Sequence, residues 1–508
     1  MLYKRRDFIR ISGITAAGSL MVPSLLQSCK GSALSGNFST YLDHFEVTAE
    51  LLKKVIRTAM SKGGDYADLY FEHTLNNYSN LEDGKVNQAS SNVAYGVGIR
   101  VLKGDQTGYS FTEIITPEAM MKAANTAASI ANETVKSITE DISELAASNL
   151  YPVTTSWENT SVKEKIPFLE RMNEKLFSLD SKVTKVNASI GDTTSYILFY
   201  NSEGLMACDY RPLVYISTTC VMEKDGRIEN FSVSRSARKG SEFLTNELVD
   251  KLAGEAVEKA NLQFLAGKPK AGEMEVVMSP GESGILLHEA IGHAFEADFN
   301  RKKTSIFSDK LNKKVAEDFI TIVDDGTLPS DRGSLNFDDE GIPTENTSIV
   351  RNGILTSYLH DRISSAYYKV KPTGNGRRQS FRFIPVPRMR STRMENGPHK
   401  PEEIIASVKK GIYVNSFSNG QVNIGAGDFT FFVKAGYVIE NGKLTMPIKD
   451  INIIGNGPVA LADISMAADD ARLADGTWTC GKAGQSVPVT LGLPTVKIKK
   501  LVVGGLNA

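Results

Sequence analysis

Two segments in the first half of the chain have apolar residues at every third or fourth position, and this spacing predicts amphipathic helices. They cover residues 48–61 and 162–179. Proline is compatible with the first turn of a helix, so Pro117 predicts a third helix that runs to about Ala131. Residues 242–265 predict a fourth, longer helix. The apolar face of the first helix contains Leu51, Leu52, Val55, Ile56 and Met60.

Between these helices the pattern changes to alternation of apolar and polar residues, which predicts strands. Residues 67–73 predict one strand, and residues 93–102 and 107–112 predict a hairpin. Further alternating segments occupy residues 183–236. The second half starts with a predicted strand at residues 273–279, and short strands separated by Gly, Asn and Asp follow. The fold class is therefore α+β: an N-terminal domain of mixed α and β structure, followed by a β-rich C-terminal domain.

A chain of 508 residues is too long for a single hydrophobic core. Its composition, 41% hydrophobic and 23% charged, is typical of a globular protein. The sequence Ala-Gly-Lys-Pro-Lys at residues 266–270 predicts a domain boundary. We expect the N-terminal domain to cover residues 46–268, with a further boundary near residues 140–160, and the C-terminal domain to cover residues 269–508.

The first 28 residues have the order of a secretory signal: a basic start, an apolar stretch and a small residue before Cys29. The apolar stretch, residues 11–26, is shorter than the roughly 20 residues that a membrane-spanning helix needs. The sequence RRDFIR at residues 5–10 resembles a bacterial twin-arginine export signal. We therefore expect residues 1–28 to be a twin-arginine signal peptide.

The sequence Leu-Gln-Ser-Cys that ends at Cys29 resembles a lipobox, in which the cysteine becomes the lipidated first residue of the mature chain. Residues 29–45 would then be the lipidated cysteine and a Ser/Gly-rich tether. The expected location is periplasmic or at the cell surface, with the protein attached to a membrane through its lipid anchor.

The charge balance argues against a nucleic-acid partner. The formal net charge is −1; the first 28 residues carry +3, so the remainder carries −4. Nucleic-acid binding depends on a clustered basic surface, which this composition does not indicate. The four cysteines are too few for a disulfide scaffold. Spacing alone does not decide whether Cys208 and Cys220 form a disulfide.

The chemistry of the chain is concentrated in residues 286–298, which contain His288-Glu289-x-x-x-His293. The common zinc-peptidase motif has one residue fewer between its histidines. In a regular α-helix, five positions rotate the second histidine by about 140° from the first, so both would not reach one ion. A π-turn restores a common face, and Gly292 would ease that distortion. We therefore predict a π-turn between His288 and His293.

Two neutral imidazoles and a third protein ligand would leave one zinc position for water, and Glu289 would take the proton of that water. The neighbouring apolar residues predict a buried helix, in which a glutamate requires a compensating role. Zinc accepts carboxylate, imidazole or thiolate ligands. Residue types therefore leave the third ligand open among Glu296, Asp298, His360, His399 and Cys480.

The C-terminal half resembles the TldD/PmbA family of metallopeptidases. The resemblance depends on several segments in one order, which together span most of this half. They are HEAIGHAFEADFNRK (288–302), DEGIPTENTSIVRNGILTSYLHDR (339–362), TGNGRRQSFRFIPVPRM (373–389), GNGP (455–458) and TCGKAGQSVPVTLGLPTVKI (479–498), followed by Gly504-Gly505.

The resemblance implies a peptidase with one Zn²⁺ per chain, held by His288, His293 and Cys480, with Glu289 as the catalytic general base. The intact motif resembles the catalytic, TldD-like type. Family members act as dimers with enclosed sites and cut small or unfolded peptides. The expected partners are therefore a peptide substrate and either a second copy or a related subunit that lacks the motif. Well-known members are cytoplasmic, so the export signal is a departure.

Two further hypotheses concern binding. In the glycine-rich, basic sequence TGNGRR (residues 373–378), Arg377 or Arg378 would bind a substrate carboxylate. Alternatively, this segment is a structured loop whose arginines pair with acidic neighbours. For the whole chain, the alternative to a peptidase is a non-catalytic regulatory or binding subunit of the same fold.

Overall fold

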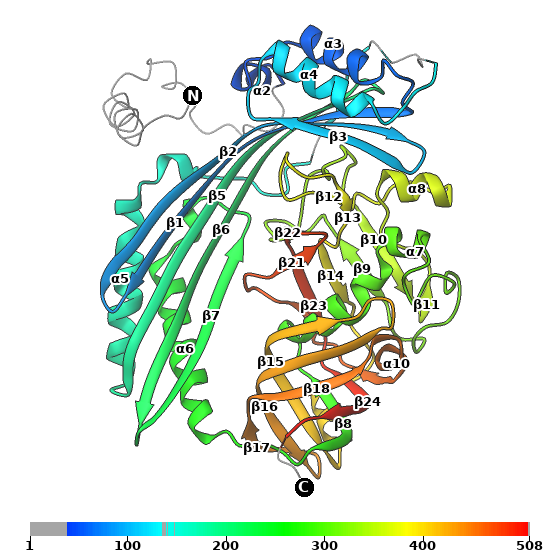
Figure 1. Ribbon diagram of the computed structural model, residues 1–508. Coiled ribbons are helices and arrows are strands. Elements are labelled where there is room, and N and C mark those ends of the chain that lie inside the picture. Colours follow the sequence, from blue (N-terminus) through cyan, green and yellow to red (C-terminus); the bar gives the residue numbers. More distant parts are fainter. Residues whose placement is uncertain (1–37, 135–138, 140, 147, 506–508) are drawn as a thin grey trace. The chain divides into compact units, whose positions relative to one another are not determined.

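Long antiparallel strands build the first half of the chain in the computed structural model, which describes residues 38–134, 139, 141–146 and 148–505. They form one sheet in the order β3-β2-β1-β5-β6-β4, with β7 beside β6 (Figure 1). Neighbouring strands pair along most of their length because connections such as Asp83-Gly84 and Asp225-Gly226, with φ between 50° and 76°, turn the chain back tightly. The strands are β1 (Tyr66–Glu82), β2 (Lys85–Lys103), β3 (Gln106–Thr112), β4 (Ser143–Glu144), β5 (Val183–Asn201), β6 (Leu205–Lys224) and β7 (Arg227–Ala237).

Helices cover this sheet at two places and divide its apolar side chains into two cores. Near one end, α3 (Ala49–Ala59) and α4 (Pro117–Ala128) bury Leu69 and Val97 of β1 and β2. Farther along, α5 (Val162–Leu179) and α6 (Asn246–Leu265) bury Ile190 and Val214 of β5 and β6. The predicted helices are therefore present. The predicted boundary near residues 140–160 connects strands of one sheet, because β1 pairs with β5.

The N-terminal part of the described chain differs from the expected tether. Residues that were expected to extend the tether to position 45 form the helix α2 (Phe38–His44). Phe38, Tyr41 and Phe45 are buried in the same core as α3 and α4. Apolar burial of these aromatic side chains stabilises a helix that is docked on the core. The Ser/Gly-rich residues before the helix had instead indicated a continuous tether. The predicted signal, residues 1–28, and Cys29 lie outside the described residues.

The strands of the first sheet are also longer than the alternation predicted. The strand expected at residues 67–73 extends to Glu82, and the expected hairpin arm at residues 93–102 starts at Lys85. The extra residues include the run from Asn76 to Asn80, whose side chains are mostly polar. These positions are strands because long neighbours on both sides pair with them, a tertiary effect that outweighs local propensity.

Two sheets form the second half (Figure 1). One has the order β11-β10-β9-β14-β23-β20 and the other β15-β8-β24-β18-β16-β17, with β19 paired to β24. Two short hairpins also lie in this half: β12 (Gly376–Arg377) with β13 (Val386–Pro387), and β21 (Thr479–Lys482) with β22 (Gln485–Pro488). The strands of the first are β9 (Ile322–Asp325), β10 (Asn346–Arg351), β11 (Ile354–Leu355), β14 (Ser391–Met394), β20 (Arg472–Leu473) and β23 (Thr490–Leu493). Those of the second are β8 (Gly272–Met278), β15 (Lys410–Val422), β16 (Asp428–Glu440), β17 (Lys443–Ile448), β18 (Ile451–Asn456), β19 (Ile464–Ala467) and β24 (Val496–Val503).

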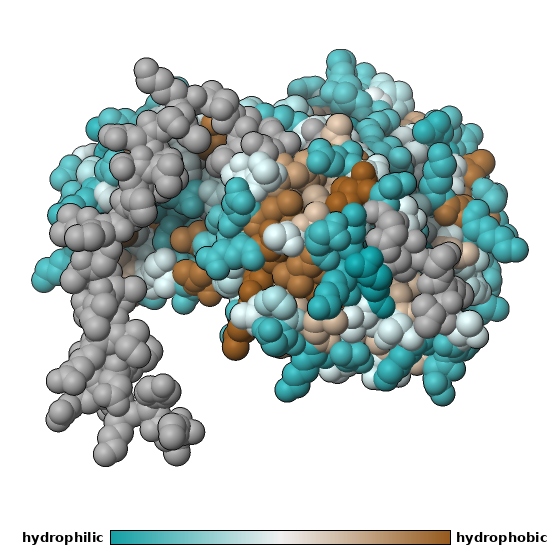
Figure 2. Space-filling model, turned by 90° about the horizontal axis from the view of Figure 1, so that it is seen from above, coloured by the Kyte–Doolittle hydropathy of each residue, from teal (hydrophilic) through white to brown (hydrophobic). Residues whose placement is uncertain are grey.

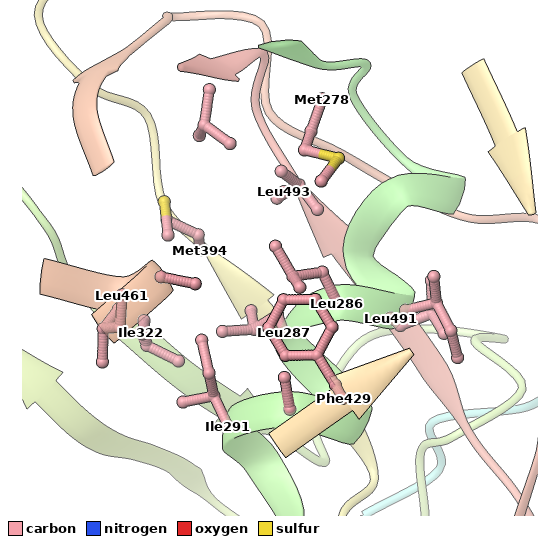
Figure 3. Packing of buried hydrophobic residues seen from close by; sticks show 14 of the residues in the cluster. Met278, Leu286, Leu287, Ile291, Ile322, Met394, Phe429, Leu461, Leu491 and Leu493 are labelled. Atoms are coloured by element: carbon pink, nitrogen blue, oxygen red, sulfur yellow. The ribbon is translucent and has the colours of Figure 1, made fainter. Parts of the chain in front are cut away.

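The motif segment lies inside the core that these two sheets share. Leu286, Leu287 and Ile291 pack among residues from both sheets, which Figure 3 shows at close range. Their neighbours there include Ile322 from one sheet and Phe429 from the other. Burial of each such side chain stabilises the fold by roughly 1.5–3 kcal/mol. The backbone around His288 and His293 is thus held by packing on both sides.

A buried ion-pair network joins the two halves. The guanidinium of Arg100 on β2 donates to Asp68 on β1 and, at 2.6 Å, to Glu340 from the second half. Arg211 on β6 donates to Asp339 at 2.6 Å. All of these side chains are at most 9% exposed. Because unpaired buried charge is costly, this network couples the position of the first sheet to the segment 338–340.

Cys208 and Cys220 are free thiols on the same strand, β6, twelve positions apart. At about 3.3 Å per residue this separation is far beyond disulfide reach, so they do not pair with each other. No helix in the described part of the chain has an apolar stretch long enough to cross a bilayer.

Candidate metal centre

The five-residue spacing of the histidines is accommodated by a π-helix. The segment η5 (Leu287–Gly292) has π-helical backbone, and a 3₁₀ turn, η6 (His293–Phe295), follows. The predicted π-turn is therefore present. It brings the rings of His288 and His293 to a centroid separation of 5.1 Å, with their planes at 81°.

The reason for glycine at position 292 differs from the one expected. Gly292 has ordinary right-handed helical angles, φ −61° and ψ −47°, so its freedom of backbone conformation is not used. A Cβ at this position would instead collide with the sulfur of Met389, which is fully buried. The glycine is thus required by close packing between the π-helix and the Met389 side chain.

Cys480 reaches the histidines from a hairpin far along the chain. The hairpin consists of β21 (Thr479–Lys482) and β22 (Gln485–Pro488), and Cys480 is paired with Val487. Its two-residue turn, Ala483-Gly484, has φ of 51° and 71°, the pattern of a type I′ turn. The buried Arg388 donates to the carbonyl oxygen of Cys480 and holds the strand in place.

The three side chains form a compact, buried cluster. One ligand atom of each of His288, His293 and Cys480 lies within 4.8 Å of the others, and Cys480 Sγ is 3.3 Å from His293 Nε2. All three residues are at most 4% exposed. Within the described residues this is the one group of three or more His, Cys, Asp or Glu side chains with such geometry.

The donor set fits a tetrahedral zinc ion. Both ring nitrogens of His288 are buried without a hydrogen-bond partner, an arrangement that is costly unless another group occupies the lone pair. Burial opposes ionisation of the Cys480 thiol, but the two neighbouring imidazoles outweigh it and hold its pKa well below the usual value. Two imidazoles and one thiolate are ligands that zinc prefers, and they leave a fourth position open.

Glu296 orients His293. Its Oε2 is 2.9 Å from His293 Nδ1, which directs Nε2 of that ring toward Cys480. Lys482, on the Cys480 hairpin, lies 3.0 Å from the same oxygen. Burial raises the pKa of Glu296, but Lys482 and His293 outweigh it and lower this pKa to about 2, so Glu296 is a carboxylate. A carboxylate bound to the outer nitrogen of a metal-binding histidine is a common supporting arrangement.

The other residues left open as third ligand lie elsewhere. Asp298 is paired with Lys482 at 2.7 Å. His360 is buried beside Tyr358 and Tyr368, and burial lowers its pKa to about 4. His399 contacts the carbonyl oxygen of Ala467 at 3.1 Å. None of these side chains belongs to the His288–His293–Cys480 cluster.

Glu289 lies at the edge of this cluster and not within it. Its Oε2 is 3.9 Å from Nε2 of His293, and its side chain is 23% exposed. The glutamate is thus close to the metal-facing side of the histidine and still reachable by water. This position suits a group that accepts a proton from a reacting water molecule.

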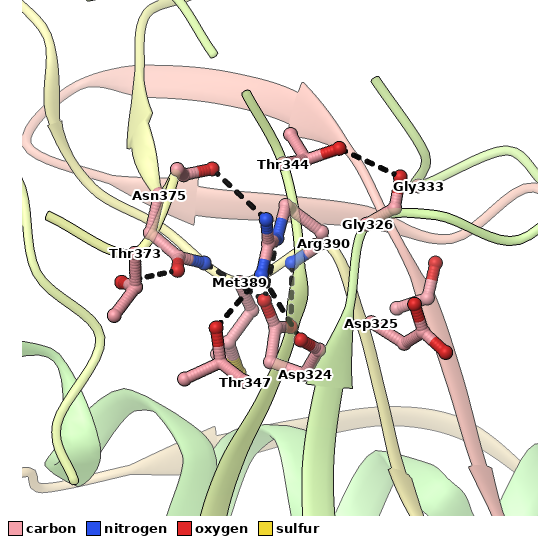
Figure 4. Close-up of polar contacts among 12 residues, drawn as sticks. Asp324, Asp325, Gly326, Gly333, Thr344, Thr347, Thr373, Asn375, Met389 and Arg390 are labelled. Carbon is pink, nitrogen blue, oxygen red and sulfur yellow. Dashed lines mark hydrogen bonds and ion pairs between the residues drawn. The ribbon is translucent and has the colours of Figure 1, made fainter. Parts of the chain in front are cut away.

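Buried hydrogen bonds hold the basic loop at residues 373–378 in place. Asn375 donates to Asp324 at 2.7 Å and Arg390 donates to the same carboxylate at 2.8 Å (Figure 4). Arg377 donates to two carbonyl oxygens, those of Met389 and Pro488.

Arg378 is fully buried, donates to the Asp339 carbonyl at 2.8 Å and lies 3.7 Å from Asp68. The side chain of Arg378 is therefore committed to the fold, whereas Arg377 donates to carbonyl oxygens and has no carboxylate partner among the described residues. Direct capture of a substrate by Arg378, as the sequence suggested, is disfavoured because its charge is already paired.

Sequence reasoning missed the supporting roles of Glu296, Lys482 and Arg388. Glu296 follows His293 by three positions, a spacing that brings side chains together on a helical turn, and this was the available signal. Lys482 and Arg388 are distant from the histidines in the sequence, so no local pattern pointed to them.

The fold and the cluster together define a mixed α+β protein with a buried His/His/Cys site of metallopeptidase type. Three consecutive segments match the domains of one family: residues 67–131 match PmbA/TldA metallopeptidase domain 1, residues 156–264 the central domain, and residues 271–505 the C-terminal domain. The chain belongs to the PmbA/TldA metallopeptidase family.

Known relatives agree with this assignment. The chain is 37% identical over 483 residues to the metalloprotease TldD homolog of Haemophilus influenzae, covering 92% of this chain and 99% of that protein. It is 30% identical over 468 residues to the zinc metalloprotease TldD homolog of Saccharolobus solfataricus, covering 89% and 99%. A crystal structure of a Bacteroides thetaiotaomicron protein, described as a candidate modulator of DNA gyrase, has the same fold, with a TM-score of 0.71, 21% identity and coverage of 90% and 98%.

Proposed function

We propose that this chain is a zinc-dependent peptidase that cleaves small or unfolded peptides. His288, His293 and Cys480 would hold one Zn²⁺. The observation that carries the proposal is the convergence of these three buried side chains, with both nitrogens of His288 left without a hydrogen-bond partner. Zinc bound there would polarise a peptide carbonyl and make a water molecule more acidic.

The residues of the chain have separate roles in this proposal. Glu289 would accept the proton of the attacking water at Oε2 and return it to the amine nitrogen that leaves. Glu296 would keep the proton of His293 on Nδ1, so that Nε2 stays free to bind the metal. Lys482 would neutralise Glu296 and hold it in that position. The surrounding apolar core would exclude bulk water from the two histidines.

The metal content of the purified chain tests the ligand set. We expect about one zinc per wild-type chain, and a strong reduction in Cys480→Ser. Cys220→Ser is a matched control, because it removes another buried thiol, which lies in a different core from Cys480. Wild-type protein that takes up no metal, even when zinc is supplied, would contradict the proposal.

Turnover of an unstructured peptide distinguishes an enzyme from the alternative, a non-catalytic regulatory or binding subunit. Glu289→Gln should retain its zinc and lose at least about 100-fold in kcat, because it removes the proton acceptor. Zinc-loaded wild type that cleaves no unstructured peptide would favour the alternative.

We also propose that the active form is a dimer, either of two copies or with a related subunit that lacks the motif. The family resemblance supports a dimer. In addition, Figure 2 shows hydrophobic residues gathered near the middle of one exposed face, and exposed apolar patches of this kind are common at protein interfaces. The molar mass of the purified chain in solution tests for a dimer of two copies. The same measurement on the chain recovered after mixing with cell extract tests for a complex with a related subunit.

Residues 1–29 support a proposal about location: export by the twin-arginine route, followed by lipidation at Cys29. Replacement of Arg5 and Arg6 by lysine should retain the protein in the cytoplasm. Cys29→Ser should release it from the membrane fraction. Unchanged fractionation of both variants would contradict the proposal.

A further inference from the structure

A cavity of about 470 Å³ lies between the first sheet and the hairpin that carries Cys480. One wall consists of residues from β1, β5 and β6, and the other of residues from the loop after Arg377 and from Ser486 to Pro488. Val487, in the second wall, is the strand partner of Cys480. The cavity and the metal cluster therefore share one hairpin.

Positive charge predominates on the wall of this cavity. Five arginines line it, against two carboxylates, Glu72 and Asp339. Three of the arginines have a carboxylate close by. Arg211 pairs with Asp209 and Asp339, Arg378 lies near Asp68, and Arg382 pairs with Glu113.

Arg238 and Arg377 are the two that remain. In the described part of the chain, neither has a carboxylate oxygen within 4 Å of its guanidinium nitrogens. Arg238 is 4% exposed, its Nε has no hydrogen-bond partner, and its NH1 makes a long bond of 3.3 Å to the Pro212 carbonyl. Arg377 donates only to carbonyl oxygens. A buried guanidinium without a counter-ion is unfavourable, so an arriving anion would be stabilised there.

The two carboxylates of the wall have hydrogen-bond partners of their own. Glu72 accepts from the Phe381 amide at 2.7 Å and from the Thr74 hydroxyl at 2.7 Å. Asp339 accepts from Arg211 and from the Arg378 amide. Burial lowers the pKa of Arg377 to about 9; Asp339 opposes this shift, and the positive charges of Arg238 and Arg388 add to it.

We propose that this cavity is a carboxylate-binding subsite in which Arg238, with Arg377 beside it, binds a carboxylate group of the peptide substrate. The carboxylate belongs either to the C-terminus of the peptide or to an acidic side chain. The inference depends on the proposed peptidase function, because it identifies which part of the peptide substrate lies beside the Cys480 hairpin. It adds a preference for anionic peptides, which the metal cluster does not explain.

Peptide binding to zinc-loaded Glu289→Gln tests the inference without turnover. Three Ala/Ser heptapeptides serve as probes: one with a free C-terminal carboxylate, one with a C-terminal amide, and one amide that contains a single aspartate. We expect the free acid or the aspartate peptide to bind roughly tenfold more tightly than the plain amide, as a charge-assisted hydrogen bond predicts. Which of the two gains affinity identifies the source of the carboxylate. Equal affinity for all three would overturn the inference.

The second arm repeats these titrations with two double variants. One combines Glu289→Gln with Arg238→Gln, and the control combines Glu289→Gln with Arg227→Gln. Arg227 is on β7 and half-exposed, outside the cavity. We expect the preference for a carboxylate to disappear with Arg238→Gln and to remain with Arg227→Gln. A preference that survives Arg238→Gln would overturn the inference. A preference seen in binding, together with no cleavage by wild type, would contradict the peptidase proposal and leave the subsite intact.

Discussion

The Nδ1 atom of His293 lies 2.9 Å from Oε2 of Glu296, and that carboxylate is in turn 3.0 Å from Nζ of Lys482. This chain of contacts links the π-helix to the hairpin that carries Cys480. It fixes the ring of His293 through a residue that is not itself part of the ligand cluster.

The first prediction concerns this contact. Glu296→Gln should reduce zinc affinity by about 10- to 100-fold, because the outer nitrogen of His293 loses its charged acceptor. Competition with a chromophoric chelator measures the affinity. Asp298→Asn is the matched control, since Asp298 also pairs with Lys482 but does not contact His293. Equal affinities for Glu296→Gln and wild type would show that Glu296 does not orient the ligand.

The second prediction concerns Gly292. Gly292→Ala should destabilise the chain by about 1–3 kcal/mol, because the added methyl group collides with the buried Met389 side chain. Zinc affinity should fall as well, since His293 is the next residue. Thermal unfolding with and without zinc measures both effects. Gly481→Ala is a control within the site, because a Cβ there meets open space. A Gly292→Ala protein with unchanged stability would show that Met389 can move aside.

The third prediction concerns the contact between the two halves. Glu340→Gln should cost roughly 3 kcal/mol, because it leaves the buried Arg100 with Asp68 as its remaining acidic partner. Differential scanning calorimetry would detect this as a lower unfolding temperature. Asp318→Asn removes a largely exposed ion pair with Lys314 and should change stability by less than about 1 kcal/mol. Similar shifts for both variants would contradict the special role of the buried network.

The fourth prediction concerns pH. Burial raises the pKa of Glu72 to about 7 in the folded chain, from 4.5 in the unfolded chain. The folded state therefore binds more protons between these values, and its stability falls as pH rises from about 4.5 through 7.

Glu72→Gln cannot ionise at this position. The unfolding temperature of the variant minus that of wild type should therefore increase as pH rises from 5 to 8. Glu174→Gln, an exposed substitution on α5, should show no such trend. A constant difference between Glu72→Gln and wild type across this range would contradict the assigned ionisation.

Local sequence patterns were sufficient for the helices and for the chemistry of the motif. The apolar face of residues 162–179 predicted α5 with the observed bounds, because a 3.6-residue period is a local property. The spacing of His288 and His293 likewise predicted a π-turn, since geometry within one helix depends only on the number of residues between them.

The tertiary structure decided how distant segments meet. Residue types left five possible third ligands. Only the position of the hairpin places Cys480 beside the two histidines. Glu296, another of the five, instead forms a hydrogen bond with His293. The arginines of the basic loop showed the same limit: whether Arg377 and Arg378 face a ligand or the fold depends on neighbours from other strands. Sequence by itself thus determined the local periodicity and the available ligand types. Pairing, burial and charge neutralisation act between residues far apart in the chain, so the role of each of these groups was decided by the tertiary structure.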